Sequence, residues 1–522
     1  MALKTAMSLS CVCLVFVGRA LGAEKGLRIE NGWLVHNGTV VWGCAQHNGW
    51  WGGYRKNTGW VHTYKVRTAL CRNAPGRMGP SFTEDLDKLT DAMLEYGYPG
   101  FEHNYGLWYD RRRDNHDTSK RADANVEPPF LEQPWARSGR SMAWDGLSKY
   151  DLTKFNPLYF ERLKEFARHC DAKGTILFHN FYMQHALLEN PAHYVDFPWR
   201  PTNCIQDTEM PDGIPAANAF YDIGNDTRRE LHRLYIRKCL DELGGNTNVI
   251  HLISEEYTGG LGFMRFWIDS IVDWERQTGK MVKIGLTGTK DVIDAILEDP
   301  TRRPRISTVC LSYWWYRGDG KLYAPEGGKE IPGRYTGNLP AETTPESLHR
   351  QIREYRLRYP DKAIIQHHRV ELEKAWAFLM GGGSMVIAGM QYPDSPPPKE
   401  PWEPPDTYIA PEESAIILPT YDFINSHLSK SLQRMRPADI VQTDGGNAWA
   451  LADNGNSYLV FCRQGRHISL DLSKAPKMPF EAKWFDPRTG ILSPAGAGTV
   501  VGAKQVSLET PDERCWVLWL YR

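Results

Sequence analysis

Short apolar runs alternate with longer amphipathic segments over most of the chain. An apolar run of about four to eight residues between turn residues is typical of a buried strand, whereas apolar residues spaced three and four apart predict a helix. Runs of the first kind begin near Val40, Gly100, Gly174, Val249, Val282, Ile306, Ala363 and Gly383. Helical patterns lie between them, as in residues 156–173, 226–243 and 263–278. This alternation predicts an α/β fold of the (β/α)8 TIM-barrel class, with a doubly wound open sheet as the alternative.

The two ends of the chain differ from this middle part. Residues 27–41 alternate around the turn signals Asn31-Gly32 and Asn37-Gly38, which predicts a β-hairpin before the barrel. After residue 437 the chain changes to short strands divided by turns, which predicts a small antiparallel β-sandwich. We therefore expect the barrel with its hairpin over residues 24–437 and the β-sandwich over residues 438–522. The linking segment is short, so the sandwich should pack against the barrel.

Residues 1–23 have the pattern of a secretory signal peptide. Lys4 precedes the short apolar run Ala6–Val17, and a small-residue cleavage site follows at Gly22 and Ala23. The run is too short to span a bilayer. The pattern predicts a secreted or periplasmic bacterial protein without a membrane span.

Four long irregular segments interrupt the strand and helix pattern, at residues 111–151, 189–221, 319–340 and 391–411. Each follows a predicted strand end, so in a barrel all four would lie at one face and wall a cleft. The chain also contains 19 Trp and 24 Tyr. That content suits a large core, a sugar-binding cleft, or both.

Charge and cysteine content argue against several classes of protein. There are 62 basic and 63 acidic residues, without the basic excess expected of a nucleic-acid partner. Of the 10 cysteines, Cys11 and Cys13 lie in the signal segment, and Cys462 and Cys515 could form a disulfide in the C-terminal region. No C-x-x-C, H-E-x-x-H or G-x-S-x-G motif occurs, so we expect no metal, no other cofactor and no serine nucleophile. The oligomeric state is open.

The strongest candidate for catalysis is a pair of carboxylates at the end of an apolar run. Val249–Ile253 is followed closely by Glu255 and Glu256, and then by the turn signal Thr258-Gly259-Gly260. In a barrel the loops after the strands build the active site, and glycoside hydrolysis uses two carboxyl groups that flank the scissile bond. We expect Glu256 to be the general acid, because it lies one residue further into the loop, with Glu255 as its partner. The alternative is a surface pair that only solvates a loop.

Other strand ends carry polar and aromatic side chains that suit sugar recognition. Glu102 is the next strand-end carboxylate, although it could equally pair with one of the arginines at 111–113. Tyr313, Trp314 and Trp315 would form an aromatic wall after the sixth strand. The expected substrate-binding residues are His47, Asn48, Trp50, His103, Asn104, Trp108, His179, Asn180, Tyr313, Trp314, Trp315, His367 and His368. His179 could instead be a satisfied histidine of the barrel.

These elements together resemble the clan of barrel glycosidases whose acid glutamate follows the fourth strand, and more specifically the apiosidase-like bacterial glycosidases. Those proteins also have an initial β-hairpin, a barrel and a small C-terminal domain often labelled collagen-binding. Residues 484–490, Trp-Phe-Asp-Pro-Arg-Thr-Gly, are similar to the hallmark of that domain, and residues 383–389 fit the small-residue last strand. Within that group, the sequence of residues 101–117 is similar to that of one branch of secreted barrel proteins. The resemblance covers most of residues 27–522 and implies a glycosidase, while "collagen-binding" is a family label and not a function.

Two positions depart from the pattern of that clan. Its acid usually follows an Asn, where this chain has Glu255, and its nucleophile is a Glu at the end of the seventh strand, where this chain reads Ile-Ile-Gln-His-His-Arg over residues 364–369. The second carboxylate could come from Glu102, Asp319, Glu326 or Glu371, or the mechanism could differ. Three hypotheses follow: a glycoside hydrolase acting on plant or algal polysaccharide fragments, a non-catalytic carbohydrate-binding barrel, and a polysaccharide lyase with a His or Tyr base.

Overall fold

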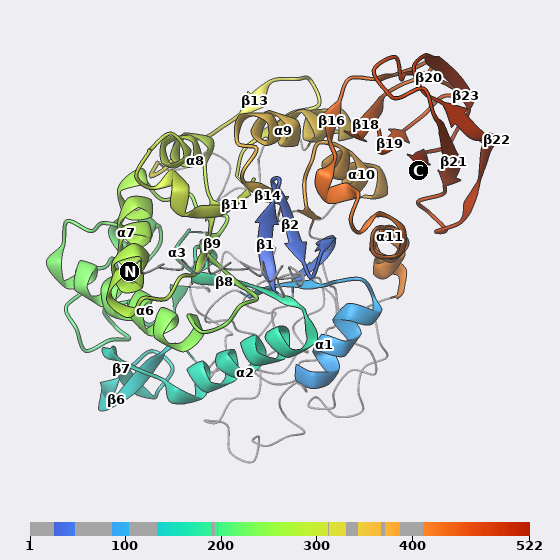
Figure 1. Ribbon diagram of the computed structural model, residues 1–522. Helices are drawn as coiled ribbons and strands as arrows, with labels where there is room; N and C mark the ends of the chain where they lie inside the picture. The colour runs from blue at the N-terminus through green and yellow to red at the C-terminus, as the bar shows by residue number, and fades with distance from the viewer. Residues whose placement is uncertain are drawn as a thin grey trace, which may run out of the picture.

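The computed structural model describes residues 26–46, 86–103, 133–188, 194–195, 197–311, 313–329, 343–366, 371–386 and 411–522. Within these ranges eight parallel strands form one curled sheet, hydrogen-bonded in chain order (Figure 1). They are β4 (Cys44–Gln46), β5 (Gly100–His103), β8 (Ile176–Met183), β9 (Val249–Glu255), β10 (Lys283–Thr287), β11 (Ile306–Cys310), β14 (Ala363–Gln366) and β15 (Met385–Val386). The helices that cover them are α1 (Leu86–Glu95), α2 (Pro157–Lys173), α6 (Asp226–Leu243), α7 (Leu261–Thr278), α8 (Lys290–Leu297), α9 (Pro345–Arg358) and α10 (Leu372–Met380). The predicted number and order of the barrel strands and the TIM-barrel class are confirmed.

Side chains on the two faces of the barrel sheet belong to separate hydrophobic clusters. Phe178, Ile250 and Leu252 pack together inside the barrel. Leu177 and Ile253, which are their sequence neighbours, pack in the layer under the helices. Consecutive residues of a strand point to opposite faces. The positions of these apolar residues therefore show which polar neighbours face the barrel interior.

The predicted β-hairpin lies at the end of the barrel where the parallel strands begin. Its strands β1 (Leu27–Glu30), β2 (Trp33–His36) and β3 (Thr39–Val40) pair antiparallel and lie inside the ring of helices (Figure 1). The Leu34 amide donates to Ser384 Oγ at 2.8 Å, directly before β15. Leu34 also joins the interior cluster. The hairpin therefore closes this end of the barrel with apolar side chains and leaves the opposite end for chemistry.

The predicted first barrel strand, over residues 40–44, has the wrong bounds. Val40 remains in the hairpin, and the barrel strand starts at Cys44. Gly43 between them has a φ of 92°, and a Cβ there would lie 2.3 Å from the carbonyl oxygen of Gly97. Since a positive φ and a close backbone approach both disfavour a side chain, glycine allows the chain to turn from the hairpin into the barrel.

The ends of the long helices follow their sequence signals. Asn156 caps α2 by accepting a hydrogen bond from the Leu158 amide, and Gly174 ends that helix in the left-handed conformation with a φ of 81°. Asn225 caps α6 in the same way by accepting from the Arg228 amide. These caps satisfy backbone groups that a helix leaves without partners. The predicted bounds of both helices therefore lie within about one residue of the observed ones.

The predicted irregular insertions contain regular structure. Residues 133–155 form an antiparallel hairpin of β6 (Trp135–Met142) and β7 (Ser148–Phe155). Of the shorter elements, α5 (Ala217–Phe220) and β13 (Leu322–Tyr323) lie in the insertions, whereas α3 (His185–Leu188), η3 (Arg303–Arg305) and β12 (Trp315–Tyr316) lie outside them. Because β6 is largely polar and exposed, it lacks the apolar alternation by which strands are recognised. Residues 111–132, 189–193, 196, 330–340 and 391–410 of the insertions lie outside the described ranges.

The sequence pattern over residues 421–434 predicts a helix, but the observed elements have other bounds. The observed helix α11 (Pro411–Phe423) begins earlier and continues as the π-helix η4 (Ile424–Leu428), and a 3-10 turn η5 (Leu432–Arg434) follows. Pro419 lies inside α11. Proline lacks the N–H that a helix interior uses, so the sequence pattern argued for a start after it.

Residues 436–522 form two antiparallel sheets, as predicted for a β-sandwich. The larger sheet has the order β16-β18-β19-β24-β21-β22, and the smaller has the order β17-β20-β23. Their bounds are β16 (Arg436–Ala438), β17 (Val441–Thr443), β18 (Ala448–Asp453), β19 (Ser457–Cys462), β20 (His467–Asp471), β21 (Pro479–Phe485), β22 (Leu492–Val501), β23 (Gln505–Glu509) and β24 (Trp516–Tyr521). Val460 and Leu518 of the larger sheet share one core with Ile468 and Leu470 of the smaller. The sequence pattern predicts strands that correspond to β18, β19, β20, β21 and β24 but not β16, β17, β22 or β23. The Ala and Gly residues of β22 give a weak strand signal.

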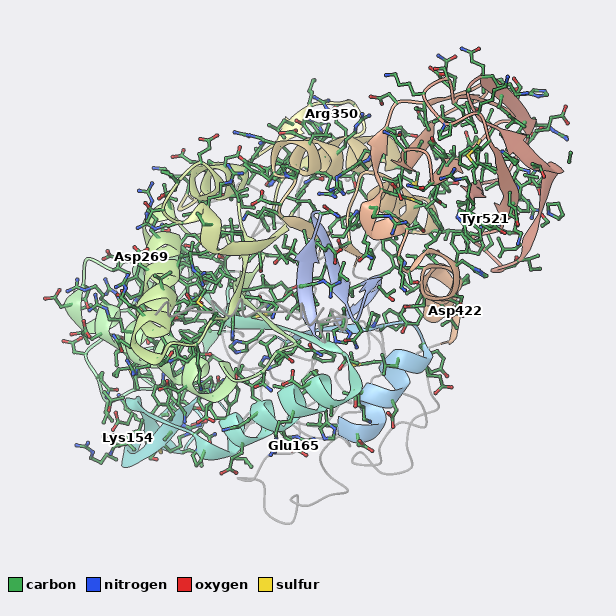
Figure 2. All side chains as sticks on the ribbon, in the orientation of Figure 1. Lys154, Glu165, Asp269, Arg350, Asp422 and Tyr521 are labelled. Atoms are coloured by element: carbon green, nitrogen blue, oxygen red, sulfur yellow. The ribbon has the colours of Figure 1, made fainter. Side chains whose placement is uncertain are left out.

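The second face of the larger sheet packs against the barrel. Phe461 and Val517 belong to the cluster of the barrel helices, not to the sandwich core. Phe485 of β21 stacks on Phe423 of α11 with ring centroids 4.1 Å apart. Figure 2 labels Asp422 on α11 and Tyr521 on β24, on either side of this junction. Because both faces of the sheet are buried, the sandwich is docked on the barrel, as its short linker predicted.

The disulfide predicted between Cys462 and Cys515 is wrong, because both cysteines are free thiols. In the pairing of β19 with β24, Cys462 lies opposite Trp516. Cys515 is the preceding residue, so it points to the opposite face of the sheet. Cys462 lies in the sandwich core and Cys515 in the junction with the barrel. Among the described helices, none is long and apolar enough to cross a membrane.

Candidate active site

Glu102 and Asn180 form a hydrogen-bonded pair inside the barrel. The strand register places Glu102 beside Phe178, which belongs to the interior cluster. Asn180 lies two residues after Phe178 and therefore on the same face. Its Nδ2 donates to Glu102 Oε1 at 2.9 Å, and both side chains are buried. The structure thus brings together two of the residues predicted for the site.

Glu255 and Glu256 lie where β9 turns into the loop before α7. Glu255 is the last residue of the strand and is 8% exposed. Glu256 is partly exposed and has a φ of 48°. Left-handed backbone is uncommon for a residue with a side chain, and such conformations concentrate at functional sites. Since β8 alone separates β9 from the strand of Glu102, the two strands lie roughly 10 Å apart, which allows two carboxylates to approach one bond.

Gln184, which the sequence did not single out, holds the loop that follows β9. Its Nε2 donates to the Glu256 carbonyl oxygen and to Thr258 Oγ1, each at 2.7 Å. Its Oε1 accepts from the Thr258 amide at 2.8 Å, and its own amide donates to Ser254 Oγ at 3.2 Å. The Gln184 side chain is buried. A buried side chain with this many bonds is held rigidly, so Gln184 determines the backbone position of Glu256.

His103, His179 and His251 occupy adjacent register positions on three neighbouring strands. The first follows Glu102 and the second precedes Asn180, so these imidazoles point to the helices and not into the barrel. The rings of His103 and His179 stack at 5.9 Å, and the Nδ1 atoms of His179 and His251 lie 3.2 Å apart. All three are buried. This placement contradicts the predicted sugar contacts of His103 and His179, and for His179 it agrees with the alternative of a histidine buried in the barrel wall.

Burial keeps the imidazoles of this layer neutral. It lowers the pKa of His103 and His251 to about 3, and it lowers the pKa of His179 well below its usual value, to which the two neighbouring imidazoles add. His232 is similar, since burial lowers its pKa to about 3. Its Nε2 donates to the Phe220 carbonyl at 2.7 Å, so its Nδ1 accepts from the Tyr182 hydroxyl at 2.9 Å.

The aromatic wall predicted after the sixth strand is divided by the structure. Trp314 is 1% exposed and packs on Tyr355 of α9 with ring centroids 5.2 Å apart, which contradicts its predicted contact with sugar. Tyr313 is also buried. Trp315 is partly exposed and contacts Tyr323 of β13 at 4.4 Å. Successive residues alternate in direction, so one tryptophan of the pair enters the core while the other remains accessible.

Several predicted residues cannot be placed at the site. His47, Asn48, Trp50, Asn104, Trp108, His367 and His368 lie outside the described residues. The seventh strand ends in Gln366, and Glu371 is the exposed N-cap residue of α10. Asp319 lies in an exposed turn beside Arg317. In the part of the chain that the structure describes, no group of three His, Cys, Asp or Glu side chains could hold a metal ion.

Two family models match the chain. One is described as "Domain of unknown function (DUF6298)" and matches residues 16–394. The other is described as "Putative collagen-binding domain of a collagenase" and matches residues 440–521. No curated protein sequence matches the chain. The first match contains every strand of the barrel and the second contains most of the sandwich.

Solved structures share the architecture of both parts. One, described as "Glycoside hydrolase", is 13% identical, covers 95% of this chain and 97% of its own, and has a TM-score of 0.55. A second, described as a glycoside hydrolase family 5 structure from Bacteroides vulgatus, is 13% identical, covers 95% of this chain and 93% of its own, and has a TM-score of 0.53. At this identity the likeness shows the fold, a TIM barrel followed by a β domain.

Proposed function

Because the chain belongs to the DUF6298 family and has the fold of known glycoside hydrolases, we propose that it is a glycoside hydrolase acting on plant or algal polysaccharide fragments. The observation that carries the proposal is the geometry at the end of β9. There the buried strand ends in Glu255, the next residue Glu256 has a left-handed backbone, and Gln184 donates a hydrogen bond to the Glu256 carbonyl oxygen. A loop that serves only as a connection does not need this arrangement.

Glu256 is the proposed general acid, which protonates the glycosidic oxygen as the bond breaks. It is partly exposed, so a substrate at the strand ends could reach it. Glu255 lies beside it and is buried. In general, two adjacent carboxyl groups resist the loss of both protons, and this keeps one of them available as an acid.

Glu102 is the proposed second carboxylate. It faces the barrel interior, and Asn180 donates to one of its oxygens, which leaves the group oriented by a neutral partner. It would act either as the base that activates water or as the nucleophile. The seventh strand, where related barrels carry a nucleophile, ends here in Gln366.

The test is hydrolysis by the full chain carrying Glu256→Gln, Glu255→Gln or Glu102→Gln, with the exposed Glu513→Gln as the matched control. Losing a general acid lowers kcat by about 10² to 10⁴. We therefore expect Glu256→Gln to lose at least about 10² in kcat and Glu513→Gln to remain fully active. Hydrolysis by Glu256→Gln at the wild-type rate would overturn its role.

The substrate panel consists of pectic, hemicellulosic and algal oligosaccharides, with products identified by mass spectrometry. Apiose-bearing pectic fragments belong in it because of the resemblance to apiosidase-like enzymes. The proposed setting is outside the cytoplasm, since residues 1–23 have the pattern of a signal peptide. These residues lie outside the described ranges, and the N-terminal sequence of the exported protein tests this assignment.

A non-catalytic carbohydrate-binding barrel is the second candidate function. Gln366 at the end of the seventh strand and the exposed position of Glu371 on α10 favour it. Glycan binding without any product across the panel would support this candidate. A released sugar carrying the elements of water would exclude it.

A further inference from the structure

A polar cleft of about 320 Å³ lies between the barrel and the sandwich, on the outer side of the barrel wall. His349 and Arg353 of α9 line one side, and strands β17, β18, β20 and β23 line the others. Figure 1 shows α9 beside β16 and β18, at the junction of the two parts. The size lies at the lower end of the range for ligand sites, about 300–1,000 Å³. The cleft has room for a short stretch of a ligand chain.

The smaller sheet of the sandwich presents its polar face to this cleft. Gln442 lies opposite Ser469 in the β17–β20 ladder, and Asp471 lies opposite Gln505 in the β20–β23 ladder. The alternating residues, such as Leu470, fill the sandwich core. Gln442 and Gln505 are exposed, and Ser469 is partly exposed. Amide and hydroxyl groups on one rigid sheet are therefore accessible to a ligand.

Trp449 and the α9 side chains form the opposite wall. The Trp449 ring stacks on His349 with centroids 4.7 Å apart and 17° between the planes, which fixes the indole. Trp449 is partly exposed. Arg353 donates two hydrogen bonds of 2.6 Å to the Asp439 carboxylate. Two contacts between lining residues therefore hold this wall of the cleft in place.

The charges of the lining argue against an anionic ligand. The guanidinium of Arg353 is already neutralised by Asp439, and Asp471 adds a negative charge. His349 is neutral, since burial lowers its pKa to about 4. An anionic ligand would meet no free cation here. The remaining donors and acceptors match the hydroxyl groups of a sugar, for which a carboxylate is a strong acceptor.

We propose that this cleft is a second, non-catalytic binding site for a neutral glycan chain. The choice of a sugar rests in part on the proposed function, whereas the site itself does not use the strand-end carboxylates. Such a site would hold one part of a polymer on the outside of the barrel while another part occupies the strand ends. Binding at two places on one chain raises the overall affinity for a long polymer over that for a short fragment.

The test is affinity electrophoresis of the full chain in gels that contain xyloglucan, galactomannan or arabinan, three neutral polymers. One variant carries Gln442→Ala with Gln505→Ala, a second carries Ser469→Trp to fill the cleft, and Gln464→Ala, an exposed glutamine elsewhere in the sandwich, is the control. Loss of two hydrogen bonds should weaken binding of the retarding polymer about tenfold. Thermal melting shows that each variant is folded.

The expected result is weaker retardation of both cleft variants, with wild-type hydrolysis of a short soluble oligosaccharide and unchanged behaviour of Gln464→Ala. Retardation of both cleft variants equal to wild type would overturn the proposal, as would a wild-type chain that no polymer retards. The Glu256→Gln variant distinguishes failure of the binding-site proposal from failure of the catalytic proposal. That variant should lose hydrolysis and keep its retardation, so each proposal can fail while the other stands.

Discussion

Acidification from pH 7.5 to 5.0 should destabilise this protein far more than its net charge would suggest. His103, His232 and His251 are buried, and burial lowers the pKa of each from 6.5 to about 3. In the unfolded chain each would bind a proton below about pH 6.5, whereas in the folded chain each stays neutral. Stability therefore rises with pH wherever the unfolded state binds more protons. The stabilisation is fully present above pH 6.5 and is lost as the pH falls toward 3.

The size of the effect follows from proton linkage. Below pH 6.5 each of these histidines removes about 1.4 kcal/mol of unfolding free energy per pH unit. At pH 5.0 the loss is about 2 kcal/mol for each and about 6 kcal/mol for the three. A folded protein is stable by about 5–15 kcal/mol. Acidification to pH 5.0 should therefore remove a large part of the unfolding free energy of the protein.

Urea denaturation followed by tryptophan fluorescence at several pH values between 7.5 and 5.0 measures this slope. His251→Phe should lower stability at pH 7.5, because it removes the hydrogen bond to His179, yet it should lose less on acidification. His467→Phe is the matched control, since His467 lies on the surface of the sandwich. An unfolding free energy that is flat across this range would refute the reasoning. Equal slopes for the two variants would refute the assignment to His251.

Two further predictions test the loop after β9 and the entry into the barrel. Replacing Gln184 with Leu removes the hydrogen bonds to Glu256 and Thr258. The kcat for hydrolysis of an oligosaccharide substrate should then fall by at least about tenfold with little change in KM. The control Gln464→Leu should change neither kcat nor KM. Gly43→Ala and Gly38→Ala both place a side chain at a residue with positive φ, but only the Cβ at position 43 would collide with backbone atoms. Gly43→Ala should therefore lower the unfolding free energy by at least about 1 kcal/mol more than Gly38→Ala does. A changed KM with an unchanged kcat for Gln184→Leu would contradict the first of these predictions. Equal melting temperatures of Gly43→Ala and Gly38→Ala would contradict the second.

The barrel could be predicted from sequence because its strands and helices have strong local patterns. The run Val249–Ile253 and the capped segment Pro157–Lys173 specify their own conformation through apolar spacing and end signals. Elements without such patterns escaped prediction. The polar hairpin of β6 and β7 owes its conformation to strand pairing, and α11 contains a proline that local rules place at a boundary.

The sequence by itself determined the order of the barrel strands and helices, the carboxylates at the end of β9 and the antiparallel β class of the C-terminal sandwich. Tertiary structure alone decided which side chains meet. Glu102 and Asn180 face the barrel interior, while His103 and His179 face the helices, because a shift of one residue along a strand reverses the direction of a side chain. Gln184 reaches the Glu256 backbone across 72 positions of sequence. The register between strands that are distant in sequence sets both the directions of these side chains and the contact of Gln184 with Glu256. A local sequence pattern carries no information about that register.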